Sequence, residues 1–152
     1  MTAFRHNFPS EWTTPLKLHH QGARGQLIVG EAGRELPFVP QRIFIVQQVT
    51  PGQVRGGHAH RQCSQFLICL SGVCRLTMDD GHESLDVTLE QPCCGLLIPP
   101  LHWVQFTLDS TSAQLLVLAS HSYDSDDYIS DYCQFQSLAL CDPCKPYRSY
   151  EC

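Results

Sequence analysis

Residues 52–72 carry the pattern that decides the fold: Gly52-Gln-Val-Arg55-Gly-Gly-His58-Ala-His60-Arg-Gln-Cys-Ser-Gln65-Phe-Leu-Ile-Cys-Leu-Ser-Gly72. In a β-strand successive side chains point to opposite faces, so His58 and His60 project the same way, ~7 Å apart. Both imidazoles are therefore expected to converge on one cavity. Burying paired histidines beside Arg55 costs free energy unless they have a purpose. Because histidine exchanges protons near neutral pH with little tuning, the pattern favours acid/base chemistry.

Short apolar runs recur on both sides of this stretch, separated by turn residues such as Pro51-Gly52, Ser71-Gly72 and Pro99-Pro100. The runs are 26–30, 42–49, 65–70, 73–78, 83–89, 94–98, 103–108 and 114–119. Short strands at this spacing are typical of an all-β barrel or sandwich. Acidic residues at 126–127 could open a helical turn late in the chain. The residues after Leu140 contain two prolines and no periodicity, which predicts an irregular tail.

The chain has 152 residues and a mass of 17.1 kDa, which predicts one domain over residues 1–152. Within it we expect a barrel over about 20–122 and an irregular, cysteine-containing tail over about 136–152. The formal net charge of -5 argues against a nucleic-acid partner but leaves room for a local anion pocket. No apolar run reaches the ~18 residues that a membrane span needs, so no membrane partner is expected.

The 9 cysteines are an odd number for a disulfide framework, and the first ten residues lack the apolar core of a signal peptide. This combination predicts a soluble, cytoplasmic protein with reduced thiols. Four of the cysteines form a C-terminal cluster with one Cys-x-x-Cys pair: Cys133, Cys141, Cys144 and Cys152. A structural zinc site usually needs two well-placed pairs, so a loose tail with free thiols is the default interpretation and zinc the alternative.

The spacing Gly-x5-His-x-His-x4-Gln-x6-Gly resembles the first motif of the cupin superfamily, and Gly95-Leu-Leu-Ile98-Pro99-Pro100 resembles the second. The resemblance implies a small jelly-roll β-barrel with its ligand pocket inside, followed by a short helical or irregular C-terminal tail. Gln65 stands where metal-binding members usually carry glutamate, and Val104 stands at the usual third-histidine position. A metal-free acid/base site is therefore favoured. The alternatives are a metal site that uses His58, His60 and His102, and a pair of merely structural histidines.

Further blocks resemble the nucleotide-sugar 3,4-ketoisomerases, the cupin enzymes that act on dTDP-4-keto-6-deoxyglucose. They cover roughly residues 20–136: Arg24-Gly25-Gln-Leu27, Glu35-Leu-Pro37-Phe38, Arg55-Gly-Gly-His58-Ala-His60, Gln65 to Gly72, Asp79-Asp80-Gly81, Val117-Leu-Ala-Ser120, Tyr123-Asp124-x-x-Asp127-Tyr128-Ile129 and Tyr132-x-x-Phe135. The resemblance implies an isomerase of deoxysugar biosynthesis. It would be cytoplasmic, homodimeric and free of metal and cofactor, and it would move the keto group of a dTDP-linked hexose from C4 to C3 through an enediolate.

The resemblance also implies roles for single residues. His58 is the expected base at carbon, and His60 is expected to assist proton movement or to hold the sugar oxygens. The expected substrate-binding residues are Arg55, Gln65, Arg24, Trp103 and His102. Tyrosines 123, 128 and 132 and the aspartates beside them are interpreted mainly as packing and capping residues of the C-terminal segment.

Two positions depart from the family pattern. Phe44 stands where the family usually has a tyrosine that pairs with the catalytic histidine, and Ser130 stands where it usually has an arginine. Losing one positioned proton-transfer group commonly costs 10²–10⁴-fold in rate. The sequence therefore leaves open a slow isomerase, an isomerase of altered specificity, and a noncatalytic sugar-nucleotide-binding protein.

Overall fold

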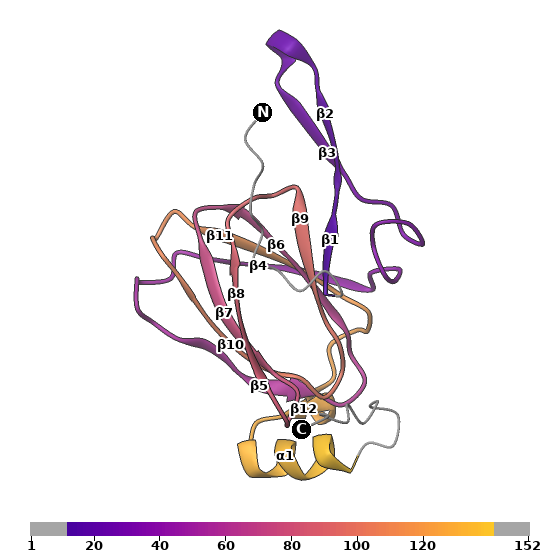
Figure 1. Ribbon diagram of the computed structural model, residues 1–152, viewed down its shortest axis with the longest axis vertical. Coiled ribbons are helices and arrows are strands. Elements are labelled where there is room, and N and C mark those ends of the chain that lie inside the picture. The colour runs from indigo at the N-terminus through magenta and orange to yellow at the C-terminus, as the bar shows by residue number, and fades with distance from the viewer. Residues whose placement is uncertain (1–11, 142–152) are drawn as a thin grey trace, which may run out of the picture.

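The computed structural model describes residues 12–141, which form two five-stranded antiparallel sheets and a two-stranded hairpin (Figure 1). In spatial order, the first sheet contains β1 (Thr13–Pro15), β9 (Cys94–Ile98), β6 (Gln65–Ser71), β11 (Gln114–Ala119) and β4 (Arg42–Gln47). The second contains β12 (Tyr128–Ile129), β5 (Arg55–His60), β10 (Trp103–Leu108), β7 (Cys74–Asp79) and β8 (Ser84–Leu89). The predicted all-β, jelly-roll architecture is confirmed.

The main core lies between the two sheets, where inward residues of both meet. Burial alternates along several strands, among them β4, β7 and β11; on β7, Cys74, Leu76 and Met78 are buried while Arg75 is exposed. Leu67 on β6 and Val117 on β11 supply the opposite side of the same core. A period of two in burial is what a strand with one buried face requires. The eight apolar runs of the sequence all form strands, with bounds within two residues of those expected.

A hairpin of β2 (Lys17–His20) and β3 (Gln26–Val29) projects from one end of the barrel (Figure 1). Its tip is the 3-10 turn η1 (Gly22–Arg24). The first barrel strand, β1, precedes this hairpin, so the barrel begins earlier than the expected position near residue 20. Sequence patterning missed β1 because three residues are too few for alternation to be visible.

The opposite end of the barrel is covered by the C-terminal segment. The turn η2 (Ser125–Asp127) leads into β12 and then into the helix α1 (Tyr132–Leu140). Asp131 caps α1 by accepting a hydrogen bond from the Gln134 amide at 2.7 Å. The irregular tail expected from about residue 136 is therefore wrong as far as Leu140, because Phe135 and Ala139 of α1 are buried against the barrel.

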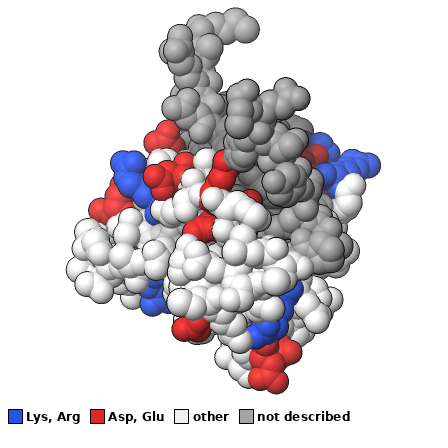
Figure 2. Space-filling model, turned by 60° about the horizontal axis from the view of Figure 1, so that its bottom comes forward, with Lys and Arg blue, Asp and Glu red and all other residues white. Residues whose placement is uncertain are grey.

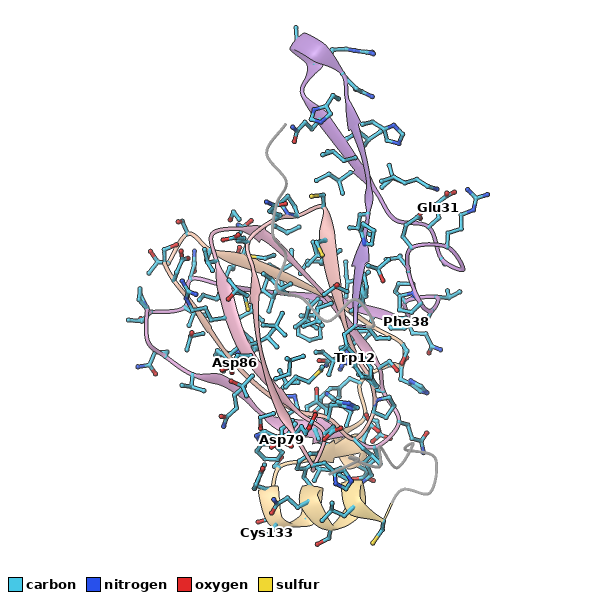
Figure 3. The ribbon with its side chains drawn as sticks, in the orientation of Figure 1. Trp12, Glu31, Phe38, Asp79, Asp86 and Cys133 are labelled. Carbon is cyan, nitrogen blue, oxygen red and sulfur yellow. The ribbon has the colours of Figure 1, made fainter. Side chains whose placement is uncertain are left out.

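A side-chain hydrogen bond also fixes α1 to the barrel. The Tyr132 hydroxyl donates to Asp79 Oδ2 at 2.6 Å, and Asp79 lies beside the helix at this end of the molecule (Figure 3). No helix within residues 12–141 is long and apolar enough to cross a membrane. Lys and Arg side chains are scattered over the described part of the face in Figure 2 and form no continuous patch.

The cysteines in the described residues are free thiols. Cys63, Cys69 and Cys74 are buried, and burial raises the pKa of Cys74 to about 12. Cys133 and Cys141 are exposed on α1 and just after it. Cys144 and Cys152, the other half of the C-terminal cluster, lie outside the described residues, so both the loose-tail and the zinc interpretations stay predictions.

Candidate active site

His58 and His60 lie on β5 with their rings together on the inner face of the second sheet. Their ring centroids are 5.2 Å apart, and the planes meet at 86°. His58 pairs with Val104, whose side chain packs against the main core, and this pairing sets the inward direction. His60 is 6% exposed, whereas His58 is half-buried.

A β-bulge at Gly56 and Gly57 sets the direction of Arg55, the residue that precedes the two glycines. Gly56 has φ 83° and Gly57 has φ 75°, values that glycine adopts without strain. The extra residue shifts the register so that Arg55 pairs with the inward residue Phe106. Arg55 therefore shares the face of His58, which regular alternation would not allow, and its side chain is exposed.

His60 is held from both ring nitrogens. Its Nδ1 lies 2.8 Å from Asp127 Oδ2, and its Nε2 lies 3.1 Å from the Gln65 side-chain nitrogen. A carboxylate only accepts, so Nδ1 carries the proton and Nε2 accepts from the Gln65 amide. Burial lowers the pKa of His60, and the hydrogen bond and charge of Asp127 offset this only in part. His60 is therefore a neutral, fixed imidazole with no nitrogen left for a substrate proton in this arrangement.

Asp127 is itself fixed by the loop after β5. It accepts hydrogen bonds from the Gln62 amide at 2.7 Å and the Cys63 amide at 3.3 Å, in addition to the bond from His60. Burial alone would raise the pKa of Asp127, but these hydrogen bonds outweigh it and hold the pKa below its ordinary value. The carboxylate is thus charged at neutral pH and orients the His60 ring.

His58 has a different environment. Burial and the neighbouring His60 lower its pKa, and a hydrogen bond to the Gly56 backbone carbonyl partly opposes them. That bond uses one ring N–H, and no other hydrogen bond to the ring comes from residues 12–141. The second nitrogen of neutral His58 is an acceptor that a general base can use.

Tyr128 brings a phenol ring to this pair. Its ring centroid lies 5.0 Å from that of His58 and 4.4 Å from that of His60. Asp127 and Tyr128 reach the site because β12 returns to pair with β5, with Tyr128 opposite His60. The sequence favours a packing role for both residues. Only the pairing of β12 with β5 reveals their place at the site, and a two-residue strand gives no periodic signal for it.

The other expected substrate-binding residues are spread over the molecule. Gln65 lies at the site through its contact with His60. Arg24 lies at the exposed tip of the hairpin, remote from β5 within one chain (Figure 1). His102 is 7% exposed, lies 2.9 Å through Nδ1 from the Pro100 carbonyl oxygen, and packs edge-on against the Trp12 ring at 5.4 Å.

Trp103 points away from the histidines. It packs on the opposite face of the second sheet, against Tyr132 at 5.2 Å and Phe135 at 5.7 Å between ring centroids. Its neighbour Val104 faces the barrel interior, so alternation sends the indole outward. The indole thus lies outside the barrel interior, where it supports α1, and its expected role in substrate binding stays a prediction.

The ligands of the alternative metal site, His58, His60 and His102, are not brought into one group. Among residues 12–141, the potential ligand atoms that gather within 4.8 Å of one another belong to His60, Cys63 and Asp127, without His58 or His102. Both carboxylate oxygens in this cluster already accept hydrogen bonds from backbone amides or from His60. The donor set therefore fits a carboxylate-oriented imidazole better than a metal ion.

The two departures from the family pattern lie in different surroundings. Phe44 faces the barrel interior and packs against the main core, with the Arg42 guanidinium carbon 5.3 Å from its ring centroid. Ser130 is exposed between β12 and α1. Phe44 therefore brings no hydroxyl to the site, whereas Tyr128 brings its phenol ring to both histidines.

Comparison with known proteins places this arrangement in context. Residues 12–139 match the family model described as FdtA, WxcM-like, C-terminal. A curated relative from Aneurinibacillus thermoaerophilus, TDP-4-oxo-6-deoxy-alpha-D-glucose-3,4-oxoisomerase, is 36% identical over 114 residues, which cover 75% of this chain and 82% of the relative.

Solved structures agree with the sequence match. A 3,4-ketoisomerase from Helicobacter canadensis is 34% identical, with a TM-score of 0.80 over 84% of this chain and 96% of that one. The ketoisomerase QdtA from Thermoanaerobacterium thermosaccharolyticum, solved as a histidine-to-asparagine mutant in complex with TDP-4-keto-6-deoxyglucose, is 29% identical. Its TM-score is 0.82 over 88% of this chain and 96% of that one.

Proposed function

The chain belongs to the FdtA, WxcM-like C-terminal family, and from this membership we infer that it is a 3,4-ketoisomerase of TDP-linked 4-keto-6-deoxyhexoses. The observation that carries the inference at the site is the contrast between its two histidines. His60 is fixed through both nitrogens, while His58 keeps one acceptor nitrogen beside it. A keto shift within one sugar needs one side chain that takes up a proton, beside fixed polar groups that hold the sugar in position.

The reaction moves hydrogen without an external oxidant or reductant. A base takes the C3 proton, the C3–H electron pair forms a C3=C4 double bond, and the C4 carbonyl electrons move to its oxygen. In the enediolate a proton moves from the C3 oxygen to the C4 oxygen. The C3 carbonyl then forms as the double bond takes a proton at C4, so atoms and electrons balance.

In this scheme His58 is the base at C3, because its acceptor nitrogen is open and its lowered pKa keeps the ring neutral near pH 7. His60, oriented by Asp127 and Gln65, positions the reacting sugar. The Tyr128 ring centroid lies 5.0 Å from that of His58, and its phenol is well placed to relay protons between the sugar oxygens. Arg55, on the same face as His58, holds a phosphate oxygen of the TDP group.

The function is tested by turnover of dTDP-4-keto-6-deoxyglucose to its 3-keto isomer, with the His58→Asn variant beside the wild type. We expect His58→Asn to abolish turnover while the Kd for TDP changes little. His82→Asn, an exposed turn histidine, is the matched control and should keep wild-type kinetics. Retained turnover in His58→Asn rules out this base, and a wild type that binds TDP without turning over the sugar rules out the isomerase.

The protein also acts, in this proposal, as a cytoplasmic homodimer. Ile43 and Ile45 on the edge strand β4 are 64% and 51% exposed, and they share a face with their partners Leu118 and Leu116 on β11. A second copy of the chain is the occupant that fits this apolar face. In such a dimer, Arg24 at the tip of the hairpin would bind the substrate of the neighbouring copy, since it is remote from the site of its own chain.

Light scattering after size exclusion tests the dimer. The wild type should elute with about twice the 17.1 kDa chain mass, and the double variant Ile43→Glu/Ile45→Glu should elute as a monomer. Val54→Glu alters an equally exposed valine outside this face, 62% exposed, and should stay dimeric. A monomeric wild type, or a dimeric double variant, would contradict the assignment.

A further inference from the structure

Arg42 occupies the inner face of the first sheet at the level of the histidines. It opens β4, and alternation puts it on the same face as Phe44 and Val46, which pack against the main core. Across the sheet, Arg42 pairs with Ala119, and Ala119 pairs with Gln65. Ala119 is fully buried. Across the sheet, only the small residue Ala119 therefore separates Arg42 from Gln65, whose side-chain amide contacts His60.

The guanidinium of Arg42 contacts aromatic rings, but its hydrogen-bonding capacity is only partly used. Its guanidinium carbon lies 5.3 Å from the Phe44 ring centroid and 5.5 Å from that of Tyr123, which are cation–π distances. Its Nε is buried and has no hydrogen-bond partner among residues 12–141. No carboxylate within the described residues forms a salt bridge with it. A buried N–H without an acceptor costs free energy unless a ligand supplies one.

The positive charge of Arg42 acts on His60 in the active site. It contributes to lowering the pKa of His60, which agrees with the short path through Ala119 and Gln65. A guanidinium keeps its proton throughout the working pH range and offers a planar fork of donors. It cannot be the base, but it matches an oxygen on which negative charge develops.

We propose that Arg42 is a catalytic residue that donates hydrogen bonds to the sugar oxygen carrying the enediolate charge. The proposal rests on the ketoisomerase function inferred above and adds the group that stabilises its intermediate. When the base takes the C3 proton, the C4 carbonyl electrons move to the C4 oxygen, and this oxygen accepts from Arg42. Arg55, assigned above to a phosphate oxygen, is exposed, and a fixed donor in a water-poor site stabilises such charge more strongly.

The test compares Arg42→Met and Arg42→Lys with the wild type on dTDP-4-keto-6-deoxyglucose, and measures the Kd for TDP alone by calorimetry. Arg42→Met should lower kcat by about 10²–10³-fold, the usual loss for one charge-stabilising donor. Arg42→Lys keeps the charge and the hydrocarbon stem but loses Nε, and should lower kcat about tenfold. The TDP Kd should stay within about threefold in both. Arg75→Met, an exposed arginine on β7, is the matched control.

The outcomes separate this proposal from the function on which it rests. A wild type without turnover refutes the isomerase itself. An active wild type with both Arg42 variants at wild-type kcat refutes only the role of Arg42. A fall in kcat matched by an equal loss of TDP affinity also refutes it, because Arg42 would then hold the nucleotide. If Arg42→Met does not fold, the kcat of Arg42→Lys decides alone.

Discussion

Replacing Asp127 by asparagine tests whether Asp127 fixes the orientation and tautomer of the His60 ring. Asparagine has nearly the same shape, so its side-chain oxygen can still accept from the Gln62 amide, which lies 2.7 Å from Asp127. Its NH₂ group, however, faces the N–H at His60 Nδ1, where the carboxylate accepted at 2.8 Å. Two donors now oppose each other, and the ring must turn or change tautomer, which in turn reverses the contact with Gln65.

The magnitude follows from what is lost. A hydrogen bond to a charged group contributes about 1.5–3 kcal/mol to stability. For a chain of this size, that corresponds to a fall in the unfolding midpoint of roughly 3–12 °C. A displacement of the His60 ring by about 1 Å lowers kcat by about 10²-fold. The substitution also removes the charge that raises the pKa of His60, so that pKa should fall further.

The assay combines calorimetric unfolding, steady-state kinetics and an NMR titration of the His60 ring. Asp126→Asn, in the same turn but with an exposed side chain, is the matched control and should leave all three unchanged. If Asp127→Asn keeps kcat within about threefold and unfolds at the wild-type temperature, the orienting role assigned to Asp127 is wrong.

Four further outcomes follow from the same geometry. Gly56→Ala should destabilise the fold by about 1–3 kcal/mol and lower kcat, because its Cβ would meet the Val104 carbonyl oxygen; Gly52→Ala, at φ 85° with open space, should cost less, and equal losses would contradict the role of the bulge. The acid limb of kcat/KM should lie below pH 6.5, since burial lowers the pKa of His58, and a midpoint at or above about pH 7 would contradict it. Folding stability should fall as the pH drops below 6.5, because the unfolded chain then binds protons that buried His58 and His60 do not; a flat profile in calorimetry would be evidence against this. Under native conditions Cys74 should resist alkylation while exposed Cys133 reacts, and equal labelling by mass spectrometry would refute the buried assignment.

The barrel was predictable because its strands are local patterns. Short apolar runs and turn residues mark most of the longer strands, and the alternation of side chains along a strand puts His58 and His60 on one face. The helix α1 was less visible because its buried face packs against Ala59, which is far away in sequence, as well as against the nearby Ile129. The outward direction of Trp103 was not visible in the sequence, because inward and outward positions look alike when aromatic residues cover both faces of a sheet.

The sequence predicted the site residues that lie together on one strand, His58 and His60, but not all of those that other strands bring to them. Asp127 and Tyr128 join the site through the pairing of β12 with β5, and Arg42 joins through a row that crosses β11. Sequence spacing carries no trace of either pairing. Arg55 shares the face of His58 only because the Gly56 and Gly57 bulge shifts the register, which two glycines suggest but do not specify.

Hydrogen exchange at the sugar carbons tests the central claim most directly. Wild-type protein is incubated with dTDP-4-keto-6-deoxyglucose in D₂O, and deuterium is located by NMR and mass spectrometry. The account predicts deuterium at C3 of the substrate pool and at C4 of the 3-keto product, with both signals lost in His58→Asn. Intact TDP binding with no deuterium at either carbon would contradict it.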